Sequence, residues 1–149
     1  MKNQLLFIAL AVLLLDGCTK MDPENSNVTE EYYIGTVSVL YEGETVDNEN
    51  IKVKFSQSND GTTASIVIYR IRFVPKMPVR INVTIPDITI QAEGSNTAFS
   101  CDRVVPLALG GEYPKYTVTD LHGEIVGDRL QFSLNFGEYP TSFSGVFNK

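Results

Sequence analysis

Few side chains in this chain could carry out a reaction, and they lie far apart in the sequence. The 149 residues include one histidine, His122, and two cysteines, Cys18 and Cys101. Hydrolysis by nucleophilic attack needs a nucleophile, a base and a group that orients the base. His122 is the only candidate histidine base, and the surrounding alternation places it on a polar strand face with Glu124 and Asp120. We therefore expect a surface histidine and a protein that is not an enzyme.

The charged residues show no pattern for a metal ion, a cofactor or a nucleic acid. A metal site needs clustered histidine, cysteine or carboxylate ligands, and the acidic residues lack that spacing. The formal net charge is −6, whereas nucleic-acid phosphates are bound by clustered lysine and arginine. The positive charges form only a loose group at Arg70, Arg72, Lys76 and Arg80. No metal, cofactor or nucleic-acid partner is expected.

The beginning of the chain carries a separate signal. Leu5 to Leu15 form an unbroken apolar run, about as long as a signal-peptide core and too short to span a bilayer. The run ends in Leu-Asp-Gly-Cys at Cys18, which resembles a bacterial lipoprotein signal. The resemblance implies cleavage before Cys18 and acylation of its thiol and its new amino group. A plain secretory peptide with a chance cysteine is the alternative.

This signal divides the chain into three parts. Residues 1–17 are the expected signal peptide, and residues 32–149 the expected folded domain. Between them, residues 18–31 contain the acylated Cys18 and the polar stretch TKMDPENSNVTEE. That stretch has too little apolar surface to order itself and predicts a flexible linker. Several acyl chains hold a protein stably on a membrane, so we expect an outer-membrane lipoprotein, with the periplasmic or external face left open.

Cys101 stands in the segment FSCDR, where an apolar run passes into a loop. With Cys18 acylated, it has no partner for a disulfide within the chain. We favour a buried, inert thiol, because free cysteine behaves as a small apolar side chain. Intermolecular pairing and a reactive thiol are the alternatives, since Arg103 could favour the thiolate.

The chain from Tyr32 onward shows the alternation of strands and no sustained helical period. In VRINVTIP the apolar residues at 79, 81, 83 and 85 point one way and the polar residues between them the other way. Residues 93–114 are irregular, and we expect a short strand there with a packed loop that could cover one end of a barrel. The pattern predicts eight or nine strands, at about 33–41, 51–57, 63–73, 79–85, 87–92, 97–101, 115–125, 129–136 and 142–147. Such a series favours an all-β sandwich or barrel.

One hairpin can be predicted residue by residue. Gly127-Asp128 suits a two-residue turn, because glycine accepts a positive φ angle. This turn pairs Val126 with Arg129. The pairs that follow are Ile125–Leu130, Glu124–Gln131, Gly123–Phe132, His122–Ser133, Leu121–Leu134 and Asp120–Asn135. A slip of one residue would mix the apolar and polar faces, so the register is well specified.

The turn at residues 59–61 leaves two registers open. A three-residue loop pairs Val53 with Val67 and sends Arg70 and Arg72 outward. A two-residue loop points both arginine side chains toward the core. We favour the first register, because burial of an unpaired charge is unfavourable.

Four short patches occur in a characteristic order. They are Tyr33-Ile-Gly35-Thr-Val37-Ser-Val39, then Met77-Pro78-Val79 followed by INVTIPDITI, then the hairpin from Gly123 to Leu130, and finally Phe143-Ser-Gly145-Val-Phe147. Together, over about residues 32 to 148, they resemble the calycin-like β-barrel domain of lipoproteins from Bacteroides-type bacteria. The resemblance implies a single closed, antiparallel up-and-down barrel of about eight strands, related to lipocalins. Its first and last strands would pair, and it brings no catalytic motif.

Two functions stay open at this point. The first is binding of a small apolar or amphipathic ligand inside the barrel. The second is a protein- or glycan-interaction module at the cell envelope, enzyme inhibitors included, with a filled barrel. A barrel of this size can be filled by its own side chains or hold one small ligand. Tyr113, Tyr116 and Tyr139 are candidates to line a ligand-binding mouth, and packing at the barrel rim is the alternative for them.

Overall fold

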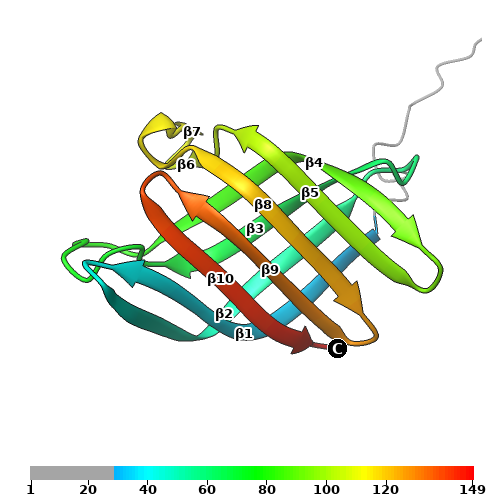
Figure 1. Cartoon of the computed structure of the whole chain (residues 1–149), viewed down its shortest axis with the longest axis horizontal. Helices are drawn as coiled ribbons and strands as arrows, with labels where there is room; N and C mark the ends of the chain where they lie inside the picture. Colours follow the sequence, from blue (N-terminus) through cyan, green and yellow to red (C-terminus); the bar gives the residue numbers. More distant parts are fainter. Residues whose placement is uncertain (1–28) are drawn as a thin grey trace, which may run out of the picture.

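The first and last strands of the chain pair with each other and close an antiparallel barrel (Figure 1). The computed structural model describes residues 29–149. Its elements are β1 (Thr29–Tyr41), β2 (Glu44–Gln57), β3 (Thr63–Ile71), β4 (Ile81–Glu93), β5 (Asn96–Val104), β6 (Leu107–Ala108), β7 (Gly111–Glu112), the 3₁₀ helix η2 (Pro114–Tyr116), β8 (Val118–Val126), β9 (Arg129–Phe136) and β10 (Tyr139–Phe147). None of the described residues forms a helix long and apolar enough to cross a membrane.

Eight strands form the closed barrel, which confirms the predicted fold class. Their order is β3-β2-β1-β10-β9-β8-β5-β4, and pairing of β3 with β4 closes the ring. The short strands β6 and β7 form an additional hairpin that pairs with β4 through β6. The predicted Cys18 lipidation site and signal peptide lie outside the described residues.

Several strands begin or end at other positions than predicted. The first strand begins at Thr29, before the predicted domain boundary, where Lys54 on β2 forms an ion pair with Glu30 at 3.0 Å. Strands β2 and β10 reach further toward their turns, and β5 extends to Val104. The predicted strand at 115–125 begins only at Val118, because the residues before it form η2.

The two strands predicted at 79–85 and 87–92 are one continuous strand, β4. Ile85 and Ile88 both face the interior, although two residues separate them. Asp87 adopts a positive φ angle of 57° between them and restores the inward direction. A β-bulge of this kind inserts a residue without ending the strand. The prediction of a break was therefore wrong.

The hairpin of β8 and β9 has the predicted register near its turn and departs from it further away. The predicted pairs from Val126–Arg129 to His122–Ser133 are confirmed. Beyond them the register shifts, and Asn135 pairs with Thr119 instead of Asp120. The predicted pairing of Asp120 with Asn135 was therefore wrong. Asp120 has a φ of 54° and forms the bulge.

The register predicted for β2 and β3 was also wrong. Val53 pairs with Ile68 and not with Val67, because the connecting loop contains four residues between Ser58 and Thr63. Continued alternation from Ile68 would turn the next even-numbered side chain, Arg70, inward. A bulge at Arg70, with φ 55°, prevents this, and Arg70 is exposed as predicted.

Candidate functional site

The interior of the barrel is filled by its own side chains. A cavity large enough for a ligand would leave accessible surface on the side chains around it. Within the described part of the chain, core residues such as Val53, Ile66 and Phe136 have 0% exposed surface. Aromatic rings also meet inside, and the ring centroids of Phe55 and Phe99 lie 5.2 Å apart. Among residues 29–149, the side chains therefore pack the interior and leave no open ligand space there.

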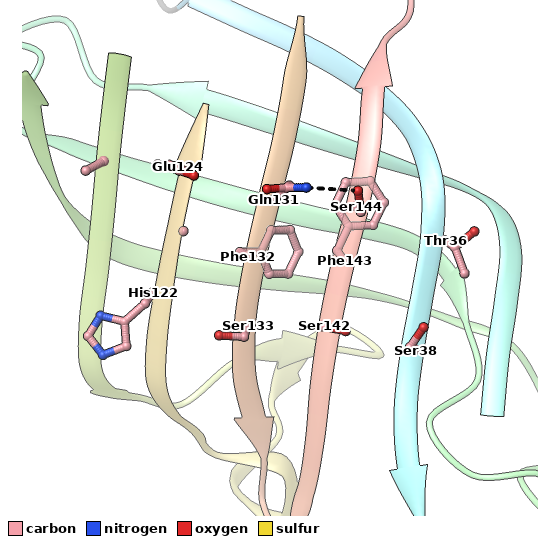
Figure 2. A pocket seen from close by; sticks show the side chains of 12 residues that line it. Thr36, Ser38, His122, Glu124, Gln131, Phe132, Ser133, Ser142, Phe143 and Ser144 are labelled. Atoms are coloured by element: carbon pink, nitrogen blue, oxygen red, sulfur yellow. Dashed lines mark hydrogen bonds between the residues drawn. The ribbon is translucent and has the colours of Figure 1, made fainter. Parts of the chain in front are cut away.

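The hollows of the molecule lie on its outer surface. The one in Figure 2 is a shallow depression of about 610 Å³ across β1, β10, β9 and β8. We call it the hydroxyl face, because small hydroxyl side chains dominate it. These are Thr36, Ser38, Ser133, Ser142 and Ser144. The amide of Gln131 donates a hydrogen bond of 3.4 Å to Ser144 Oγ. This surface can offer hydrogen bonds to a partner, but it holds no nucleophile beside a positioned base.

His122 and Glu124 lie exposed at the edge of the hydroxyl face, and the predicted position of His122 on the polar face is confirmed (Figure 2). Among residues 29–149, the structure gives His122 no side-chain hydrogen bond that would orient its ring. General base catalysis requires such positioning against a nucleophile. Across the same residues, no group of three or more histidine, cysteine or acidic side chains could hold a metal ion.

The three tyrosines predicted as mouth residues come together at one end of the barrel. The rings of Tyr113 and Tyr116 stack with centroids 5.2 Å apart, and the ring centroid of Tyr139 lies 6.2 Å from that of Tyr116. Tyr41 extends the row, at 5.8 Å from Tyr139. We call these four residues the tyrosine end. Tyr41 is not one of the three predicted mouth residues, although the expected pairing of the first and last strands places it near Tyr139.

The tyrosine end closes the barrel instead of forming an open mouth. Tyr116 is buried on η2, and its ring centroid lies 4.9 Å from that of Phe73 in the core. Tyr41, Tyr113 and Tyr139 are half-buried and leave part of each ring accessible. Tyr116 therefore packs at the barrel rim, which was the alternative to a ligand-binding mouth. The other three tyrosines present aromatic surface to the outside.

Two carboxylates flank the exposed tyrosines. Tyr41, Glu42, Glu138 and Tyr139 line a hollow of about 460 Å³ between the β1–β2 and β9–β10 turns. Burial, followed by the neighbouring Glu42 charge, raises the pKa of Tyr41. Burial and the neighbouring Glu138 likewise raise the pKa of Tyr139. Both phenols are therefore neutral at physiological pH and can donate hydrogen bonds.

Cys101 lies half-buried on β5, partly packed against the core. Burial raises the pKa of its thiol, and the Arg103 backbone N–H opposes this effect only in part. A thiol with a raised pKa is a poor nucleophile at neutral pH. The position therefore favours the inert interpretation over the reactive one.

No protein-family model and no curated protein matches this chain.

Proposed function

We propose that this protein is a non-enzymatic, lipid-anchored envelope protein that binds a protein or glycan partner through its outer surface. The filled barrel is the observation that carries this proposal. A packed core with side chains such as Val53 and Phe136 at 0% exposure makes a rigid scaffold. Residues on rigid strands and tight turns can hold a binding surface with little loss of conformational entropy on association.

The tyrosine end is the first candidate for the binding surface. Tyrosine is enriched where interfaces gain most of their affinity, because its ring is large and its hydroxyl remains polar. The flanking Glu42 and Glu138 can accept hydrogen bonds from sugar hydroxyls or from basic side chains. Strand β1 runs from Thr29 at one end of the barrel to Tyr41 at the other, the left end in Figure 1. A chain anchored through Cys18 would thus present the tyrosine end away from the attachment point.

Site-specific photocrosslinking in cells tests this surface. A crosslinking residue placed at Glu138 should capture a partner, because this position borders the tyrosine hollow. The same residue placed at Asp128, in the turn at the opposite end, is the matched control. Addition of Tyr41→Ala and Tyr139→Ala should abolish capture at 138, and a glycan array should show whether the partner is a carbohydrate. Equal capture at both positions, or capture that survives both substitutions, would contradict the proposal.

Membrane anchoring belongs to the same proposal. The support comes from the apolar run that ends at Cys18 and from the polar linker after it. We place the protein in the outer membrane, held by acyl chains on Cys18.

Binding of a small apolar ligand inside the barrel is the second candidate function. The closed barrel and the resemblance to calycin-like domains support it. Entry of such a ligand would require displacement of core side chains, for example the stacked pair Phe132 and Phe143, whose ring centroids lie 5.2 Å apart. Native mass spectrometry with a panel of lipids distinguishes this function from binding at the outer surface.

A further inference from the structure

A second surface of the barrel concentrates positive charge around one hollow. This hollow, of about 560 Å³, lies on the outside of β2, β3 and β4. We call it the basic hollow. Its cationic residues are Lys52 on β2, Arg70 on β3 and Arg80 directly before β4. The chain as a whole carries a formal net charge of −6, so the local charge at this hollow is opposite in sign to the net charge of the protein.

Two β-bulges shape the basic hollow. Asn50 on β2 has a φ of 59° and Arg70 on β3 a φ of 55°, and such angles are uncommon for residues other than glycine. The regular pairing of β2 with β3 ends at Val53 and Ile68, so the strands separate beside the two bulges. Bulges re-aim side chains and occur next to functional sites. Here the bulge directs Arg70 outward.

The lining residues themselves hold this backbone in place. The Arg70 backbone N–H donates a hydrogen bond of 2.9 Å to Asn82 Oδ1. Arg80 Nη1 donates to the Arg70 backbone carbonyl at 3.4 Å. On the other side, Lys52 Nζ lies 4.2 Å from the centroid of the Tyr32 ring and 5.6 Å from that of Tyr69. These contacts position the Lys52 ammonium group, the Arg80 guanidinium group and the Arg70 backbone before any ligand arrives.

The cationic groups of the basic hollow have no carboxylate partner among the described residues. Within residues 29–149, the one ion pair joins Lys54 to Glu30, and no carboxylate lies within 4.0 Å of Lys52, Arg70 or Arg80. Glu49 is the only acidic residue of the lining. Three positive charges and one negative charge leave a net charge of two positive units at the hollow.

We propose that the basic hollow binds the phosphate group of a small phosphorylated molecule or of a lipid head group. A phosphate monoester carries about −1.5 to −2 charges near pH 7 and offers three strong acceptor oxygens. This matches the net charge of the hollow, whereas a carboxylate supplies only one charge. Arginine suits phosphate because its planar fork can donate two parallel hydrogen bonds. The volume lies within the usual range of small-molecule sites, about 300–1,000 Å³, and leaves room for an organic body beside Tyr69.

Backbone-amide NMR of the full-length Cys18→Ala chain tests the site directly. Titration with inorganic phosphate, and then with a phosphorylated sugar, should shift the amide signals of Lys52, Tyr69, Arg70 and Asn82 at constant ionic strength. Chloride and acetate at the same ionic strength should leave those signals nearly unchanged. Binding should weaken as the pH falls from about 7 to about 5, because the second pKa of phosphate is about 6.

Charge variants assign the binding to the basic hollow. Arg70→Asn removes the charge and keeps a residue that tolerates a positive φ angle, and Arg80→Gln removes the second charge. Each should weaken phosphate binding about tenfold, as expected for loss of a charge-assisted hydrogen bond. Arg129→Gln, on a strand outside the hollow, should leave the affinity unchanged. Unchanged thermal unfolding of the variants will show that they remain folded.

A second experiment, with lipid vesicles, shows whether the bound phosphate belongs to a free molecule or to a lipid head group. Vesicles that contain phosphatidic acid, compared with vesicles of phosphatidylcholine alone, test the lipid head group. Binding of free phosphate compounds or selective binding of the phosphatidic acid vesicles would each support the site, provided that Arg70→Asn weakens it. The proposal would be overturned if neither the free phosphate compounds nor the phosphatidic acid vesicles bound. Equal binding by wild type and Arg70→Asn would also overturn it. These experiments test the basic hollow alone, so their result is independent of the binding proposed for the tyrosine end.

Discussion

Gly35 on the first strand lies directly opposite Gly145 on the last strand, at the seam where the barrel closes. A Cβ atom at position 35 would collide with the backbone of Ser144 and of Gly145. A Cβ atom at position 145 would meet the Phe143 ring and would lie 2.8 Å from the Ile34 carbonyl oxygen. The close approach of the two strands therefore requires glycine on both sides.

Gly35→Ala and Gly145→Ala should each destabilise the barrel. Overpacking of this kind lowers the free energy of unfolding by about 1–3 kcal/mol, and urea denaturation measures it. Gly111→Ala is the matched control, because a Cβ atom there has no neighbour within 4 Å. The control should change stability by less than about 0.5 kcal/mol. Equal stability of all three variants would contradict the close approach of β1 and β10 at Gly35 and Gly145.

Removal of a core ring should create the space that the wild-type barrel lacks. Phe132 is 4% exposed and stacks on Phe143. Phe132→Ala should lower the free energy of unfolding by about 3–5 kcal/mol. The resulting apolar cavity should bind benzene, as dry engineered cavities do, and benzene should then raise the midpoint of thermal unfolding. Val126→Ala, at a side chain 44% exposed, serves as control. Benzene stabilisation of the wild type would contradict a filled interior.

Alternation made the strands and the β8–β9 turn predictable from the sequence. The bulges at Arg70, Asp87 and Asp120 were not predictable in the same way, because none contains a glycine or a turn motif. Their positive φ angles keep apolar side chains inward over long, paired strands, so they depend on tertiary contacts. A missed bulge changes the register beyond it, and this explains the wrong pair Asp120–Asn135. The wrong pair Val53–Val67 has another cause, because the loop between Ser58 and Thr63 contains four residues instead of three.

The candidate surfaces were predictable only in part. The tyrosines near strand ends could be chosen because strand ends meet at the rim of a barrel. The basic hollow had a weak signal in the loose group that includes Arg70 and Arg80. Lys52 joins them only through the pairing of β2 with β3 and the bulges beside it, which the sequence does not specify.

Asp60 should titrate far below an ordinary aspartate. Its Oδ1 accepts hydrogen bonds from Ser58 Oγ at 2.7 Å and from the Thr62 backbone N–H at 3.1 Å. These bonds, that from Ser58 first, lower the pKa of Asp60 from 3.8 to about 2. A lowered folded-state pKa stabilises the fold above the unfolded value, and the contribution is lost as the pH falls through about 2.

Carboxyl NMR titration measures the Asp60 pKa directly. Asp60→Ala should lower the midpoint of thermal unfolding at pH 7, and the difference from the wild type should shrink as the pH falls below the ordinary aspartate range. Glu112→Ala, at an exposed residue of β7, provides the comparison. A pKa near 3.8 for Asp60 would show that the turn bonds do not persist in solution.

Cys18→Ala should release the protein from the membrane or leave an unprocessed precursor. Labelling with fatty-acid analogues should disappear, because the acylated thiol is gone. Cys101→Ala should keep both the label and the membrane fractionation, since that thiol lies on the barrel strand β5. Membrane fractionation and labelling of Cys18→Ala equal to the wild type would remove the proposed role of Cys18.

Native mass spectrometry of the Cys18→Ala chain, isolated from its host without refolding, tests the filled barrel most directly. The account predicts the mass of the polypeptide alone, and the same mass after incubation with fatty acids and other apolar molecules. Core side chains with 0% exposure leave these molecules no place inside. A stoichiometric increase in mass from an apolar molecule, accompanied by shifts of the core signals in NMR, would contradict the filled scaffold and establish a ligand carrier instead.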